Sequence, residues 1–164
     1  MPIRPARASD VPAIRRCVRD AYAVYGARLD RPPAPVLDDY AAQVRARTVY
    51  VDRTSELRAV VVLEARVDHL FIRNLAVRPE FQGRGIGRAL LDFAEGKARA
   101  LGLGELRLAT NERMTENLVY YPKRGFRAVG RGVEDGYYRV FFSKSVRTLS
   151  PVRKSRRTAA RAAR

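Results

Sequence analysis

The sequence is short of cysteine, of histidine and of long apolar runs, and each shortage excludes a class of protein. The single cysteine, Cys17, has no partner for an internal disulfide. The longest uninterrupted apolar stretch, residues 59–63, is far shorter than the roughly 20 residues that cross a bilayer. The first ten residues, MPIRPARASD, lack the apolar core of a secretory signal. We therefore expect a cytoplasmic protein with no membrane-spanning segment.

Residues that bind metals are also scarce. The only histidine is His69, and neither it nor Cys17 stands at metal-ligand spacing from other ligand types. We therefore predict no metal site. Cys17 falls among apolar residues of a helical pattern, where a small buried side chain is the expected role.

Basic residues outnumber acidic ones, most strongly at the C-terminal end. The 33 Lys and Arg against 17 Asp and Glu give a net charge of +16. Residues 147–164 contain no acidic residue and few large apolar groups, so we expect a disordered tail after one folded domain over residues 1–146. The basic tail is a candidate for weak contact with a polyanion. Most of the basic residues are arginines, a bias that GC-rich codons also produce without any such partner.

The apolar periodicity predicts a mixed α/β fold. From Val11 to Tyr25 apolar side chains recur at three- and four-residue steps, which predicts a helix with Ser9 as N-cap and Asp10 in its first turn. Runs rich in β-branched residues predict strands. One domain is expected, with a sheet of about seven strands flanked by about four helices. The predicted strands are residues 3–6, 48–52, 57–64, 69–77, 106–109, 126–130 and 137–142, and the predicted helices are residues 11–25, 36–45, 85–100 and 115–124.

A glycine-rich stretch joins the fourth predicted strand to the third predicted helix. Residues 75–88 read LAVRPEFQGRGIGR. The three alternating glycines have no Cβ to block an approaching ligand, and the helix after them begins with unpaired N–H groups and the positive end of its dipole. These features predict a site for phosphate or pyrophosphate, to which Arg84 and Arg88 add positive charge.

Two common nucleotide-binding motifs and a plain turn fit these glycines less well. The dinucleotide motif G-x-G-x-x-G needs glycine where this sequence has Arg88, and it follows the first strand of a fold, not the fourth. A P-loop needs Gly-Lys-Ser/Thr, which is absent. A tight turn with no ligand would need one or two glycines and none of the Gln and Arg residues between them.

In these residues the sequence resembles the GNAT superfamily of acyl-CoA-dependent N-acyltransferases. The family signature Q/R-x-x-G-x-G/A is matched by residues 82–87, QGRGIG, and the typical Leu-Ala-Val-x-Pro precedes it at residues 75–79. The family's Tyr-x-x-x-Gly-Phe is matched by residues 121–126. The resemblance covers about residues 2–144.

The resemblance implies that coenzyme A lies where the fourth and fifth strands splay apart. Its pantetheine would bind backbone groups near the end of the fourth strand, and its pyrophosphate would bind the glycine-rich loop. Many members carry Asn seven residues before the tyrosine, where this sequence has Met114, and Asn117 is an amide on the same helix face. The implied cofactor-binding residues are Leu75, Ala76, Val77, Gln82, Gly83, Arg84, Gly85, Ile86, Gly87, Arg88 and Asn117.

The implied activity is transfer of an acetyl group from acetyl-CoA to a primary amine, by direct attack in a ternary complex. The amine belongs to a small molecule or to a protein. Tyr121 is the implied catalytic acid for the departing sulfur, and Pro122 is expected to disturb the helix beside it. A backbone N–H near Val77 is the expected oxyanion donor. Candidates for the base that accepts the amine proton are Glu64, Asp68 and His69.

The basic charge leaves a second interpretation open. In it, a GNAT-like domain has lost catalysis and associates with nucleic acid through the basic tail. In either case the sequence is expected to form a monomer or a homodimer.

Overall fold

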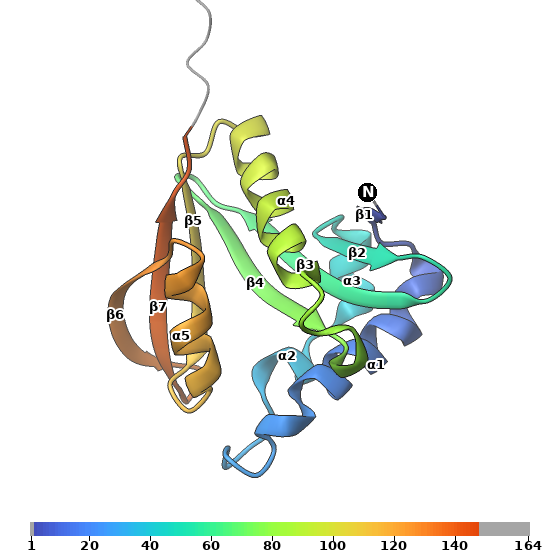
Figure 1. Ribbon diagram of the computed structural model, residues 1–164, viewed down its shortest axis with the longest axis horizontal. Coiled ribbons are helices and arrows are strands. Elements are labelled where there is room, and N and C mark those ends of the chain that lie inside the picture. The colour runs from blue at the N-terminus through green and yellow to red at the C-terminus, as the bar shows by residue number, and fades with distance from the viewer. Residues whose placement is uncertain (1, 148–164) are drawn as a thin grey trace, which may run out of the picture.

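Seven strands form one mixed sheet in the computed structural model, which describes residues 2–147 (Figure 1). The strand order is β1-β2-β3-β4-β5-β7-β6, and every neighbouring pair is antiparallel except β4 and β5. This confirms the predicted α/β sheet. The predicted tail, apart from Arg147, lies outside the described residues. The strands are β1 (Ile3–Pro5), β2 (Val49–Arg53), β3 (Leu57–Ala65), β4 (Leu70–Val77), β5 (Glu105–Asn111), β6 (Arg127–Glu134) and β7 (Tyr137–Ser145).

Five α-helices accompany the sheet in the described residues, one more than predicted. The expectation of a single helix over residues 36–45 is wrong, because Asp38 is extended with ψ 147° and Asp39 starts a new helix by accepting from the N–H of Ala42. None of the helices in residues 2–147 is both long enough and apolar enough to cross a membrane. The helices are α1 (Val11–Tyr22), α2 (Ala34–Leu37), α3 (Tyr40–Arg45), α4 (Ile86–Ala100) and α5 (Thr115–Lys123).

The start of α1 also differs from the prediction. Ser9 is not its N-cap: it lies inside a 3₁₀ turn, and Asp10 takes the cap position. The Asp10 carboxylate is almost fully buried, accepts from the N–H of Arg7 at 2.8 Å, and pairs with Arg4 at 2.8 Å and Arg53 at 3.3 Å. These three partners hold β1, α1 and β2 together.

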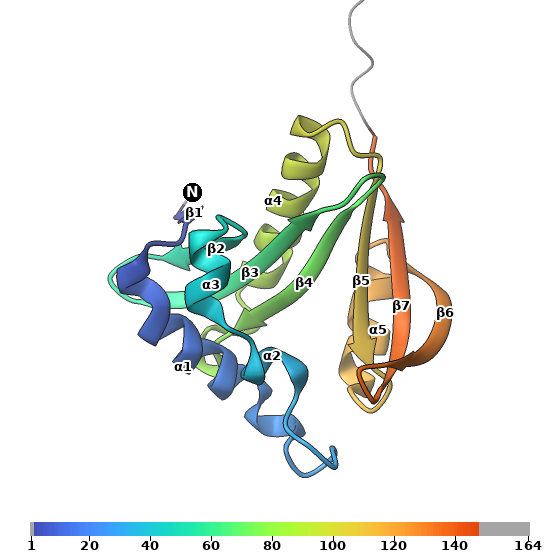
Figure 2. The ribbon, with the colours of Figure 1, turned by 180° about the vertical axis from the view of Figure 1, so that it is seen from behind.

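Helices cover both faces of the central strands (Figure 2). In β3, Val60 and Val62 face α1 and α3, whereas Ala59 and Val61 face α4. Because successive side chains of a strand point to opposite faces, a β3 buried on both faces is apolar almost throughout. The core therefore has two layers, one on each side of the sheet.

The two parallel strands pair over only part of their length. Leu70–Ile72 of β4 are in register with Leu106–Leu108 of β5, and beyond these residues the strands diverge (Figures 1 and 2). The divergence begins at a β-bulge: Val62 pairs with Asn74 and Leu63 with Ile72, so Arg73 has no partner on β3. A bulge bends its strand and increases the local twist. The splayed strand pair that the family resemblance implied is therefore present.

Candidate functional site

The splayed part of β4 presents backbone groups that no strand pairs with. Arg78 donates its N–H to the carbonyl of Arg58 on β3 at 2.9 Å, and bonded and non-bonded positions alternate along an antiparallel pair. Ala76 therefore directs its peptide groups to β3, whereas Leu75 and Val77 direct theirs to the side from which β5 has diverged. Free N–H and C=O groups on this side are what an amide-rich chain such as pantetheine needs.

The glycine-rich loop continues directly from this edge. Gly83 and Gly85 have φ of +74° and +79°, and a Cβ on either would meet no atom within 4 Å, so the loop is open to solvent as well as left-handed. Gly85 is the N-cap of α4, and the first turn of that helix exposes unpaired N–H groups. Gln82 donates its side-chain amide to the carbonyl of Val77 at 2.9 Å, which ties the loop to the end of β4.

Asn117 lies half-buried on α5, beside the diverging end of β5. Its amide nitrogen donates to the hydroxyl of Thr110 at 3.0 Å and lies 3.8 Å from the sulfur of Met114. These contacts fix the amide, and its oxygen makes no hydrogen bond within residues 2–147. The side chain can therefore accept one hydrogen bond from a ligand.

Tyr121 lies on the buried side of α5, and Pro122 does not displace it. The helix continues through Pro122 to Lys123, and the N–H of Arg124 donates to the carbonyl of Tyr121 at 2.9 Å. The ring packs edge-on against Phe126, with centroids 5.6 Å apart. Burial raises the pKa of the Tyr121 phenol well above its ordinary value. Its hydroxyl has no hydrogen-bond partner in the described residues and is not among their fully buried unpaired atoms, so it is not completely sealed from solvent.

Tyr120 points to a different part of the site. A Cβ on Gly87 would lie 2.7 Å from the Tyr120 hydroxyl and 3.8 Å from Cγ2 of Val77. Tyr120 therefore bridges α5 to the first turn of α4, next to the loop. The guanidinium of Arg124 stacks on the Tyr120 ring, with its Cζ 4.8 Å from the centroid, and its buried Nε has no partner within residues 2–147. Sequence reasoning missed Arg124, because no motif marks it.

A pocket opens between the diverged strands on the side of α1 and α2. β4, β5 and β7 contribute to its wall, and Tyr22 closes it from α1. The Tyr22 hydroxyl donates to Asn74 at 2.7 Å, and Asn74 in turn donates to the hydroxyl of Tyr40 at 3.0 Å. This buried chain of hydrogen bonds fixes the pocket wall. The lining residues include Tyr22, Pro33, Arg73, Asn111, Tyr137 and Arg139.

The three candidate bases are not brought to this pocket. Asp68 and His69 pair with each other at 2.6 Å just before β4, at the end where β4 and β5 are still joined. At about 3.3 Å per residue, the length of β4 places them more than about 20 Å from Val77. Glu64 pairs with Arg66 at 2.6 Å and with Arg73 at 3.5 Å. Within residues 2–147, no three His, Cys, Asp or Glu side chains gather as a metal site would require.

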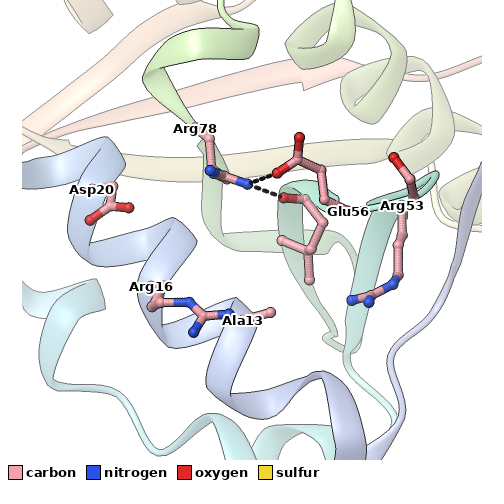
Figure 3. Close-up of a pocket in the computed structure, with 8 residues that line it drawn as sticks. Ala13, Arg16, Asp20, Arg53, Glu56 and Arg78 are labelled. Carbon is pink, nitrogen blue, oxygen red and sulfur yellow. Dashed lines mark hydrogen bonds and ion pairs between the residues drawn. The ribbon is translucent and has the colours of Figure 1, made fainter.

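A second pocket, of about 290 Å³, lies between α1 and the β2–β3 hairpin (Figure 3). Figure 3 shows Arg78 bonded to Glu56, and their side chains are 2.7 Å apart. Arg53, which also lines this pocket, is paired with Asp10. The lining of the pocket includes no residue of the loop at residues 82–88 and none of β5. Because Arg53 and Arg78 are each paired with a carboxylate, and because the pocket includes neither that loop nor the diverged part of β5, we do not assign the site here.

Comparisons with known proteins identify the family of the chain and solved structures of similar fold. A family model described as Acetyltransferase (GNAT) family matches residues 14–126. The uncharacterized N-acetyltransferase YvbK of Bacillus subtilis (strain 168) is 31% identical over 97 residues, which cover 58% of this chain and 61% of that protein. The chain thus spans about three fifths of this curated relative.

Two solved structures have a similar fold at low sequence identity. The PaiA N-acetyltransferase from Thermoplasma acidophilum, in complex with coenzyme A, has a TM-score of 0.73 at 18% identity, covering 87% of this chain and 97% of that one. The ribosomal-protein-S18-alanine N-acetyltransferase from Escherichia coli has a TM-score of 0.70 at 18% identity, covering 92% and 96%. Both alignments span nearly the whole of each relative.

Proposed function

The chain belongs to the GNAT acetyltransferase family, and on this premise we propose that it is an acyl-CoA-dependent N-acetyltransferase that moves an acetyl group from acetyl-CoA to a primary amine. The observation that carries the proposal is the unpaired backbone edge of β4, which leads directly into the loop at the start of α4. One continuous surface thus offers amide partners and then an anion site, in the order of pantetheine and pyrophosphate. When bound, acetyl-CoA supplies an activated acyl carbonyl and a thiolate leaving group.

The residues that would hold the cosubstrate fall into two groups. Leu75 offers its free N–H and C=O to the pantetheine, Val77 keeps only its N–H free at the end of the strand, and the free oxygen of Asn117 accepts from the pantetheine. The N–H groups of the first turn of α4 bind the pyrophosphate, helped by the positive end of the helix dipole. Arg84 and Arg88 are exposed on the same loop and turn, and Arg124 is a further cation nearby.

The end of β4 also supplies the electrostatic part of catalysis. The N–H of Val77 faces the open side, where it can donate to the oxygen on which negative charge develops. Such a fixed donor contributes roughly 10²–10³ in rate. The side-chain amide of Gln82 donates to the Val77 carbonyl, so this carbonyl already has a partner. The N–H of Val77 stays available.

Tyr121 is the proposed acid. Its hydroxyl has no competing partner in the described residues, so it can donate to the departing sulfur. As the amine nitrogen adds to the carbonyl, negative charge would develop on the oxygen that the Val77 N–H faces. As the C–S bond then breaks, Tyr121 would give its proton to the sulfur, and the proton that the nitrogen loses would replace it through water. We propose direct attack in a ternary complex, because Cys17 is unsuited to a covalent intermediate: it is fully buried, and burial raises the pKa of its thiol to about 12.

Calorimetry with acetyl-CoA tests the assignment of the loop. Gly85→Glu places a carboxylate at the anion site and is expected to weaken binding by about tenfold or more. Gly102→Glu is the matched control: Gly102 follows α4, has a φ of +70° and likewise has no atom within 4 Å of a Cβ. Both variants carry the same backbone strain and the same charge. Equal affinities in the two variants would show that the loop does not bind the pyrophosphate.

A further inference from the structure

The pocket on the α1 side has an unusual balance of charge. Its lining contains two arginines, Arg73 and Arg139, and neither Asp nor Glu. A pocket built for a polyamine or another cationic acceptor would need carboxylates in its wall, because an ammonium group beside guanidinium groups is repelled. The charge of this wall therefore disfavours cationic acceptors.

The two arginines differ in whether their charge is already balanced. Arg73 makes two 2.9 Å hydrogen bonds to Asp38 and lies 3.5 Å from Glu64, so its charge is satisfied inside the protein. The Arg139 side chain makes no hydrogen bond or ion pair within residues 2–147, and its Nε is sealed from solvent without a partner. Burying a charged donor without an acceptor is costly. The unbalanced charge of the pocket is thus that of Arg139.

Arg139 is also held in a fixed position. Its guanidinium stacks on the ring of Tyr137, with Cζ 5.2 Å from the centroid. The Tyr137 hydroxyl donates to the carbonyl of Pro32 at 2.6 Å, which anchors the ring to the segment before α2. Arg31 lies over the same ring, at 4.6 Å, and donates to the carbonyl of Gly136 at 2.9 Å. The ring against which Arg139 lies is therefore anchored before any ligand arrives.

From this arrangement we propose that the acceptor is an amine that also carries a carboxylate, as an amino acid does, and that Arg139 binds the carboxylate. A guanidinium presents parallel N–H donors that match the two oxygens of a carboxylate. The inference rests on the proposed acetyl transfer and specifies its acceptor. The amine would then lie deeper in the pocket, between the diverged β4 and β5, where the unpaired edge of β4 begins.

The test uses the full chain, acetyl-CoA and matched acceptors, with thiol release as the signal. The acceptors are the standard L-amino acids, the corresponding amino-acid amides and spermidine. We expect kcat/KM for the best amino acid to be about 30-fold or more above kcat/KM for its own amide. This factor corresponds to the low end of the free-energy cost of removing one partner of a buried charge pair. Arg139→Gln should reduce that ratio to near one by raising KM for the amino acid, and Arg139→Lys should restore part of it. The KM for acetyl-CoA should not change.

Arg131→Gln is the control, because Arg131 lies on the adjacent strand β6 with a side chain 67% exposed and outside the pocket. If amides or spermidine are acetylated as well as every amino acid, or if Arg139→Gln keeps the preference for the carboxylate, the inference about the acceptor is wrong and the proposed acetyl transfer stands. If no amine of any of the three kinds is acetylated, the inference about the acceptor is wrong, and the proposed acetyl transfer is wrong as well if calorimetry detects no binding of acetyl-CoA.

Discussion

Replacing Gly87 by alanine should reveal whether Tyr120 occupies the space that the structure gives it. A Cβ at position 87 would lie 2.7 Å from the Tyr120 hydroxyl, a distance that real Cβ atoms do not tolerate. Without that oxygen, the nearest atom of the ring is Cζ at 3.7 Å, which is an ordinary contact. The effect of Gly87→Ala should therefore depend on whether residue 120 is tyrosine or phenylalanine.

Two opposing terms set the size of the effect on the free energy of unfolding. Gly to Ala inside a helix stabilises by about 0.5–1 kcal/mol. Overpacking against a neighbour costs about 1–3 kcal/mol. With Tyr120 present, the second term cancels or exceeds the first, so Gly87→Ala should be neutral or destabilising. With Tyr120→Phe, only the helix term remains, and the substitution should stabilise.

Urea unfolding of the four proteins of this double-mutant cycle measures the coupling, which we expect to be about 1–3 kcal/mol with equal m-values. In the Gly87→Ala single variant the displaced ring should also raise the KM for acetyl-CoA, because it lies between the loop and α5. If Gly87→Ala stabilises both backgrounds by the same amount, the Tyr120 hydroxyl does not lie against α4.

Two further predictions concern the acid and the buried carboxylate. Tyr121→Phe should lower kcat by roughly 10²-fold or more, with little change in acetyl-CoA affinity. Tyr120→Phe is the control and should leave kcat nearly unchanged. Equal losses of kcat in steady-state assays of the two variants would refute the choice of Tyr121 as the acid. Arg4 beside Asp10 holds the pKa of that carboxyl below its ordinary value, so the stability that this carboxylate contributes is present above about pH 4 and is lost as the pH falls through the lowered pKa. Asp10→Asn should therefore cost about 1–3 kcal/mol near pH 7 and progressively less toward pH 2 in urea titrations, and a cost independent of pH would contradict this.

Local patterns predicted most elements to within a few residues. The helix predicted at residues 85–100 is Ile86–Ala100, and the strand predicted at 69–77 is Leu70–Val77. The strand predicted at 126–130 is longer, Arg127–Glu134, because pairing with β7 overrides the two glycines inside it. Strand pairing is a tertiary effect, so the composition of β6 alone could not predict its length.

The two halves of the site differ in how far the sequence predicts them. The loop at residues 82–88 is contiguous, and its glycines and the following helix suffice to predict an anion site. The pocket of Arg139 is built from α1, the segment before α2, and three strands that the sheet order β4-β5-β7 brings together. No spacing in the sequence links Tyr22 to Arg139, so only the topology identifies the pocket.

Unpaired guanidinium groups lie on both sides of the splayed strands. In residues 2–147 the sealed side-chain atoms without a partner are Gln43 Oε1, Arg124 Nε and Arg139 Nε. Arg124 is fixed on Tyr120 beside the loop, and Arg139 on Tyr137 in the pocket. A fold does not gain stability from such atoms, because each sealed Nε–H loses its hydration without receiving an acceptor. Their cost is offset if each meets an anion, the phosphates of the cosubstrate on one side and the carboxylate of the acceptor on the other.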